Sequence, residues 1–230
     1  MDKIEKVKSI SVWVFIIPFI ALNACLILIT KFHGLFPNQE HIIHNTIPYI
    51  DGQVSISRTA RVFPTYLIFK PAMFLTSYLL IKYWLYTKDI ILFFNKNHKN
   101  IKYIMFFGIG SAVLLTIHSI FLGIKFDNDF YKLFRRIIML SFIIFELVAQ
   151  TYLVMTYYSF KNILLKFINQ NFLKMKLILV LTLIIVALIS IPLVTMPGNK
   201  FLKHALEWDY FIALISFYLL TYFMWKKKNK

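Results

Sequence analysis

The chain of 230 residues is 59% hydrophobic and 18% aromatic, and only 16% of its residues are charged. A soluble domain is about half apolar and about a quarter charged, so this composition excludes an ordinary soluble domain and favours lipid as the solvent. The net charge of +16 would suggest nucleic acid as the partner of a soluble protein. The lysines lie mainly between apolar blocks, however, which excludes a basic face for nucleic acid and indicates contact with anionic lipid headgroups.

Six apolar segments follow one another along the chain, at residues 10–30, 63–86, 103–124, 133–160, 177–195 and 206–225. Each is long enough to cross a bilayer as a helix, which takes about 20 residues. Backbone polar groups must be satisfied internally in lipid, and the alternation that a β-barrel needs is missing. The sequence therefore predicts an all-α, multi-pass integral membrane protein, with residues 1–230 forming a single bundle of six transmembrane helices.

The distribution of basic residues predicts the orientation of this bundle. Lysines are more frequent in the two terminal tails and in the second and fourth connectors than on the opposite side. The positive-inside rule then places both termini in the cytoplasm. The longest outer connector, residues 31–62, leads into a segment in which Lys70 is followed at once by Pro71. A polar group entering an apolar run marks a candidate functional site.

Glu146 and Gln150 lie midway along the fourth segment, four residues apart and therefore on one face of the helix. An ionisable group at that depth costs roughly 2.5–3.5 kcal/mol on insertion scales and usually faces the bundle interior. One interpretation is a site for a proton, an ion or a lipid headgroup. The alternative is a structural hydrogen-bond network between helices.

Lys70, His118 and Asn23 lie on three other segments at depths where they could join Glu146. We expect Lys70 to point inward toward Glu146 and His118, which would form a headgroup cavity open to the outer leaflet. The alternative is that Lys70 extends its amine to the interface and His118 bonds a carbonyl group.

Charged residues gather at the predicted outer interface. Arg58 and Arg61 lie in the connector, Arg135 and Arg136 begin the fourth segment after Asp127 and Asp129, and Glu207, Trp208 and Asp209 begin the sixth. Arginine forks hold phosphate well, so a phospholipid or glycolipid headgroup fits this interface. The alternative is that these charges only anchor helix ends to one another and to water.

Motifs for metals, cofactors and catalysis are missing. His41 and His44 form an H-x-x-H with His33 and Glu40 nearby, but no helix or turn motif fixes them, so we expect no metal site. No nucleotide-binding loop, nucleophile elbow or zinc-protease motif occurs, which predicts no cofactor. The glycines of the GIGS sequence at residues 108–111 predict close helix packing.

Three short motifs resemble those of the Frag/DRAM/Sfk family. Pro48-Tyr49-Ile50-Asp51, followed by Pro64 and Ile68-Phe69, resembles its P-x-I-S/D … P … I-F pattern, although residues 52–60 are an insertion. GIGSAVLLTIHSIFLG resembles its G-x-x-S-A-x-x-L segment, and HALEWDYF its A-x-x-E-W segment. The resemblance covers most of the chain. It implies six helices with cytoplasmic termini and a role in a lipid-linked process such as GPI remodelling. The matching positions are Pro48, Asp51, Pro64, Glu207 and Trp208.

These patterns favour a membrane protein that binds or handles a lipid or lipid-linked headgroup on the outer-leaflet side, with membrane lipids as partners. Its site would extend from Pro48 to Phe69, closed by Glu207 and Trp208 and flanked by Arg135 and Arg136. One alternative is an integral-membrane hydrolase or acyltransferase using His118 and Glu146, against which the lack of a nucleophile motif counts. Another is a small proton-coupled transporter using Glu146 and Lys70, against which the lack of inverted repeats counts.

Overall fold

The computed structural model describes the whole chain except residues 1, 97, 125–127, 197 and 227–230. Within this described part the regular elements are helices, joined by one antiparallel bridge between Ile168 and Trp225. Six of the helices are long: α1 (Asp2–Lys31), α4 (Tyr66–Phe94), α5 (Ile101–Phe121), α6 (Asp129–Ser159), α8 (Gln170–Thr195) and α9 (Lys200–Met224). The predicted all-helical fold is confirmed.

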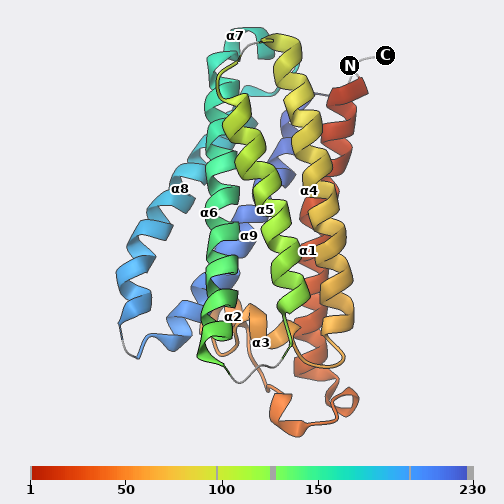
Figure 1. Ribbon diagram of the computed structural model, residues 1–230, viewed down its shortest axis with the longest axis vertical. Coiled ribbons are helices and arrows are strands. Elements are labelled where there is room, and N and C mark those ends of the chain that lie inside the picture. Colours follow the sequence, from red (N-terminus) through yellow and green to blue (C-terminus); the bar gives the residue numbers. More distant parts are fainter. Residues whose placement is uncertain (1, 97, 125–127, 197, 227–230) are drawn as a thin grey trace.

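The long helices pack into a closed bundle in which α1 contacts α4, α4 contacts α5, α5 contacts α6, α6 contacts α8, α8 contacts α9, and α9 returns to α1. Figure 1 shows α1 beginning and α9 ending at the same end of this bundle. We call this end the terminus end. The segment between α1 and α4 covers the opposite end, which we call the loop end.

Four helices, α1, α5, α6 and α8, are long and apolar enough to cross a membrane. Helix α8 is the most exposed of them, since only 17% of its most apolar stretch is buried. Figure 1 shows α8 leaning away from α6 toward the loop end. An apolar helix that exposes most of its surface needs lipid or another apolar partner around it. The structure is therefore compatible with a membrane protein.

The long helices extend beyond the apolar segments that predicted them, as α4, α8 and α9 illustrate. Helix α4 continues past residue 86 to Phe94, and its added turns place Asp89 within 3.2 Å of Lys3 of α1. Helix α8 begins at Gln170 instead of residue 177, and α9 begins at Lys200 instead of residue 206. These added turns contain charged residues, so an apolar stretch marks only the middle of such a helix.

The two glycines of the GIGS sequence lie where α5 meets its neighbours. A Cβ atom on Gly108 would lie 2.5 Å from the Trp84 ring of α4. A Cβ atom on Gly110 would lie 2.7 Å from the Phe145 ring of α6. The predicted close packing is confirmed, and it places large aromatic rings directly on the backbone of α5.

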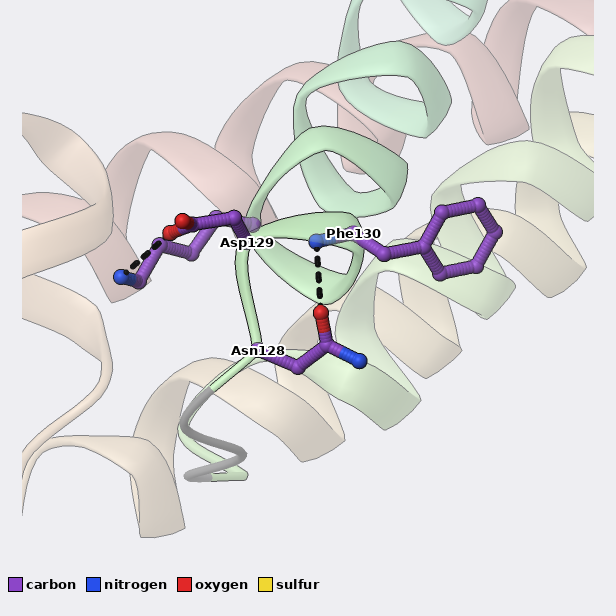
Figure 2. A network of polar contacts seen from close by, with 4 residues as sticks. Asn128, Asp129 and Phe130 are labelled. Atoms are coloured by element: carbon purple, nitrogen blue, oxygen red, sulfur yellow. Dashed lines mark hydrogen bonds and ion pairs between the residues drawn. The ribbon is translucent and has the colours of Figure 1, made fainter.

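The start of α6 is fixed by local polar contacts, drawn in Figure 2. The Asn128 side-chain oxygen accepts a 2.9 Å hydrogen bond from the Phe130 N–H, and the Lys132 amine lies 2.9 Å from the Asp129 carboxylate. An N-cap of this kind stabilises the first helical turn. It sets the position of Arg135 and Arg136 one to two turns further on. The predicted Asp127 lies outside the described residues.

The segment between α1 and α4 contains four short helices: η1 (His33–Leu35), η2 (Gln39–His41), α2 (Pro48–Asp51) and α3 (Ile56–Ala60). It shares a small hydrophobic core with the end of α1, formed by Ile29 of that helix and by Phe36, Ile43, Val54 and Val62 of the segment. We call residues 32–65 the cover loop. Its core gives it a defined shape, and α2 and α3 pack against α9.

At the terminus end the chain closes on itself. After α7 (Lys161–Leu164), the Asn169 N–H donates to the Met224 carbonyl at 2.8 Å, and the Lys226 N–H donates to the Phe167 carbonyl at 2.9 Å. These two bonds hold Trp225 over the interior, where its ring lies 5.8 Å from that of Tyr157.

Candidate functional site

The cover loop docks on α9 through a turn at Gly52, whose φ is +59°. A Cβ atom there would lie only 1.8 Å from the Phe201 carbonyl oxygen, so the loop backbone lies directly on the backbone of α9. His204 Nδ1–H donates to the Gly52 carbonyl at 2.9 Å, and Trp208 Nε1–H donates to the Val54 carbonyl at 2.8 Å. Glycine is required at position 52 for both its conformation and its lack of a side chain.

Asp51 shapes the turn that leads into this contact. Its carboxylate accepts hydrogen bonds from the Thr46 hydroxyl at 2.7 Å, the Ile47 N–H at 2.8 Å and the Gln53 N–H at 3.0 Å. Burial alone would raise the pKa of this carboxyl, but the three hydrogen bonds outweigh it and lower the pKa. Pro48 opens the same short helix and is buried. Pro48 and Asp51, both predicted as site residues, therefore stabilise the conformation of the loop.

Glu207 and Trp208 of α9 face the docked loop. The Trp208 indole is fully buried and meets the Tyr49 ring edge-on, with 5.1 Å between centroids. The Glu207 carboxylate accepts a hydrogen bond from the Ser57 N–H of α3. The loop therefore contacts Glu207 and Trp208 at one end of the bundle, as the sequence predicted. These two side chains hold the loop, and the neighbouring Tyr49 and Asp209 face a cavity.

That cavity is an open lateral groove of about 500 Å³ between α1, α8 and α9, under the cover loop. Its polar wall contains Asn23, Tyr49, Asp209 and Ser216, and its apolar wall contains Phe19, Leu179, Ile212 and Ala213. The Tyr49 hydroxyl donates to the Asn23 side-chain oxygen at 3.1 Å. We call this cavity the lateral groove. Its combination of an apolar wall with a few polar groups is typical of a small-molecule site.

A cluster of arginines lies elsewhere at the loop end. Arg61 is within electrostatic range of Arg58 and Arg135, and Arg135 lies over the Tyr131 ring, 5.9 Å from its centroid. Arg136 is exposed. In the described part of the chain no ion pair joins any of these arginines to an acid. Like charges held close together create a positive potential that attracts anions.

Lys70 does not point toward Glu146, so that prediction is wrong. Its amine donates to the Ile120 carbonyl at 3.2 Å, near the loop end of α5, and lies 5.9 Å from the centroid of the Tyr66 ring. The long stem lets the amine reach the helix end, as the alternative interpretation proposed. His118 is buried and its Nδ1 atom has no hydrogen-bond partner, while Pro64 lies just before α4, half-buried.

Glu146 lies inside the bundle, where three donors surround it. Its carboxylate accepts from the Ser111 hydroxyl of α5 at 2.6 Å, from the Gln150 amide at 2.9 Å and from the Tyr218 hydroxyl of α9. Gln150 also donates to the Leu214 carbonyl at 3.1 Å. Glu146 and Gln150 therefore lie on one face of α6, as expected, and they form a hydrogen-bond network that joins α6 to α5 and α9. It borders a separate cavity of about 20 Å³ and not the lateral groove.

Sequence reasoning missed Lys176, which it assigned to a cytoplasmic connector. The structure places Lys176 inside α8 with none of its surface exposed. Its amine donates to the Thr221 hydroxyl at 2.6 Å and lies 3.7 Å from the centroid of the Phe217 ring. The apolar residues that follow it from Leu177 were the available signal, since a lysine adjoining such a run can enter the membrane span.

The histidines of the cover loop contact each other. The His33 and His44 rings meet edge to face, with 4.7 Å between centroids. Throughout the described ranges, no three His, Cys, Asp or Glu side chains come together as ligands for a metal ion.

Comparison with known proteins adds no relative. No protein-family model, no curated protein and no solved structure matches this chain.

Proposed function

We propose that this chain is a six-helix membrane protein, with both termini cytoplasmic, that binds a membrane lipid or lipid-linked molecule in the lateral groove. The terminus end would then face the cytoplasm, and the cover loop would lie at the outer leaflet. Helices α4 and α9, of 29 and 25 residues, are within the 21 to 31 residues of the other four and close the same bundle. The excess of lysines at the terminus end supports this orientation.

The lateral groove is the observation that carries the proposal. Its volume of about 500 Å³ is within the range of roughly 300–1,000 Å³ typical of small-molecule sites. It opens sideways beside α8, the helix with the most exposed apolar surface. A lipid chain would contact Leu179 and Ile212, and its headgroup would reach the polar groups of Tyr49 and Asp209.

The polar groups of the groove favour a headgroup that carries hydroxyl or amine donors. The Asp209 carboxylate and the Asn23 amide oxygen are acceptors, and the Tyr49 hydroxyl both donates and accepts. The arginine cluster provides positive charge for a phosphate at the same end of the bundle. The resemblance of the Pro48 and Glu207-Trp208 motifs to the Frag/DRAM/Sfk family favours the same class of lipid-linked process.

The test is to fill the groove with a bulky side chain. Ala213 lines the groove, whereas Ala187 of α8 is equally half-buried but lies outside it. We expect the wild-type protein to copurify with lipid in native mass spectrometry, and Ala213→Trp to lose that lipid. Ala187→Trp should retain it. Lipid-free wild-type protein, or equal lipid content in both tryptophan variants, would contradict the proposal.

A further inference from the structure

The lateral groove presents hydrogen-bond acceptors to a ligand, because its own side-chain donors are already used. The Asn23 amide nitrogen donates to the Phe19 carbonyl at 2.8 Å, and the Tyr49 hydroxyl donates to the Asn23 side-chain oxygen at 3.1 Å. The Ser216 hydroxyl donates to a main-chain carbonyl of its own helix at 2.8 Å. A ligand therefore meets the Asp209 carboxylate and the free lone pairs of the Tyr49 and Ser216 oxygens. To bond to these atoms it must bring N–H or O–H donors.

Asp209 gives the groove a negative charge. The described residues that line the groove include no lysine, arginine or histidine. Asp209 is exposed, and within the part of the chain that the structure describes no cation pairs with its carboxylate. Burial raises the pKa of the Tyr49 hydroxyl, the hydrogen bond to Asn23 lowers it, and the Asp209 charge raises it again. The carboxylate and the Tyr49 oxygen therefore lie close enough to act on one ligand group.

Polar and apolar atoms follow one another along the groove. One face of α9 contributes four lining residues, Asp209, Ile212, Ala213 and Ser216. Residues 209–216 span about 10 Å of helix. Asp209 is the lining residue nearest the start of α9, where the loop helix α2 that contains Tyr49 packs against it. A ligand with a charged tip and an apolar chain therefore fits with its tip at Asp209 and its chain along Ile212 and Ala213.

The charge of Asp209 decides between classes of headgroup. A lipid seated in the groove displaces water from the carboxylate, which costs free energy unless an opposite charge replaces the water. A neutral headgroup with hydroxyl donors brings no such charge, and an anionic headgroup is repelled. A trimethylammonium group brings the charge but no N–H donor. A primary ammonium group brings the charge together with three N–H donors, so it matches both properties of the groove.

We infer that the lateral groove selects lipids whose headgroup ends in a primary ammonium group, which donates to the Asp209 carboxylate and to the Tyr49 oxygen. This inference rests on the proposed lipid site and adds the class of lipid that the site takes. Hydrogen bonds between an ammonium and a carboxylate are roughly twice as strong as neutral ones. Asp209 therefore acts as the residue that determines specificity, and the apolar wall binds the chain of any lipid.

The test compares lipids that share their acyl chains and differ in their headgroups. Full-length protein is reconstituted in nanodiscs that contain equal amounts of phosphatidylethanolamine, phosphatidylcholine and phosphatidylglycerol, and native mass spectrometry identifies the lipid that stays bound. These lipids carry a primary ammonium, a trimethylammonium, and hydroxyl donors with a net negative charge, respectively. We expect bound phosphatidylethanolamine to be enriched at least about fivefold over each of the others, because a charge-assisted hydrogen bond at a partly exposed site contributes about that factor.

Substitution of Asp209 tests its role in this selection. Asp209→Asn keeps the shape of the side chain and removes its charge, so lipid should still bind but without the enrichment. Asp209→Glu keeps the charge and should keep the enrichment. Asp129→Asn is the matched control, because Asp129 is an exposed aspartate at the start of α6 that pairs with Lys132 outside the groove. It should leave the enrichment unchanged.

The outcomes separate this inference from the proposed function. If wild type binds lipid and Ala213→Trp loses it, but phosphatidylethanolamine is not enriched, the inference is overturned and the lipid site stands. Enrichment that persists in folded Asp209→Asn would also overturn the inference. Lipid-free wild-type protein, or lipid retained by Ala213→Trp, would contradict the site and the inference together. The comparison of lipids on wild type needs no substitution, so a variant that fails to fold does not prevent the test.

Discussion

The cover loop and the hydrogen-bond network around Glu146 are held in opposite ways. The loop rests on α9 through main-chain groups: the Gly52 backbone touches the Phe201 carbonyl, and two side chains of α9 donate to loop carbonyls. The Glu146 network depends on side-chain donors, because the Ser111, Gln150 and Tyr218 side chains all donate to the Glu146 carboxylate. Two backbones in direct contact leave no space for an added side-chain atom. A side-chain network instead loses a hydrogen bond whenever one of its donor or acceptor atoms is removed. The loop should therefore be sensitive to one added methyl group, and the Glu146 network to one deleted hydroxyl.

The largest effect should come from adding that methyl group. Gly52→Ala would place Cβ 1.8 Å from the Phe201 carbonyl oxygen at a positive φ. Left-handed backbone alone costs roughly 1–2 kcal/mol for a residue with a side chain, and the overlap adds to it. We expect a loss of at least about 2 kcal/mol in the free energy of unfolding, with the loop released from α9. Thermal unfolding in detergent and protease cleavage within residues 32–65 measure both.

Gly34→Ala is the control for this variant. Gly34 lies in the same loop, and a Cβ atom there would meet nothing within 4 Å. It should leave both the unfolding temperature and the cleavage rate close to wild type. If Gly52→Ala were equally harmless, α2 would not rest on α9 as described.

Deleting the Tyr218 hydroxyl tests the hydrogen-bond network around Glu146. Tyr218→Phe removes one of the three donors to Glu146 without creating a large cavity. A buried polar group that loses its partner costs about 1–3 kcal/mol, and we expect a destabilisation in this range. Tyr210→Phe is the matched control, because the buried Tyr210 hydroxyl has no partner and its loss should be neutral or stabilising. Equal effects of the two substitutions would argue against a network centred on Glu146.

Acidification should loosen the loop by a smaller amount. Burial lowers the pKa of His204, and the neighbouring positive charges of Lys200, Lys203 and Arg58 lower it further against the opposing hydrogen bond to Gly52. The unfolded chain then takes up a proton first, so stability falls as the pH drops below about 6.5 toward the lower folded value. Burial also lowers the pKa of His98, so His98 contributes to the same pH dependence. The difference between the stabilities of wild type and His204→Gln, measured across pH, isolates the contribution of His204. A pH dependence identical in both would contradict it.

The smallest effect on stability should follow replacement of Lys176. Its amine makes one hydrogen bond, to a neutral hydroxyl, while its stem is surrounded by aromatic rings. Exchanging a buried charged group for an apolar one of similar length is often neutral or stabilising. We expect Lys176→Met to stay within about 1 kcal/mol of wild type in thermal unfolding. A loss above that limit would mean that the lysine mainly holds helices together.

The sequence predicted the helical fold because long apolar stretches in lipid permit little else. It also placed Glu146 and Gln150 on one face, because helical periodicity alone decides that. It did not predict the direction of Lys70 or the burial of Lys176. Both lysines adjoin apolar runs, and only the packing of neighbouring helices decides whether such a side chain reaches the interface or is enclosed.

The cover loop was predicted only in part. Its proline and aspartate motif indicated a shaped segment near Glu207, and the structure has that contact. The requirement for Gly52 was not foreseen, since it depends on the backbone of a helix about 150 residues later in the chain. The lateral groove was missed for the same reason, because it is formed by α1 near the start of the chain together with α8 and α9 near its end.

The hydrogen bond of Lys176 has a consequence for synthesis of the chain. Thr221 follows Lys176 by 45 residues, and Trp225, which forms the antiparallel bridge with Ile168 at the terminus end, comes later still. A newly made α8 therefore carries an amine without its acceptor until the last helix arrives. Completion of α9 is the event that encloses the base. A chain stopped before Thr221 would lack the hydroxyl that accepts the Lys176 hydrogen bond, and the Lys176 amine would be left without this partner.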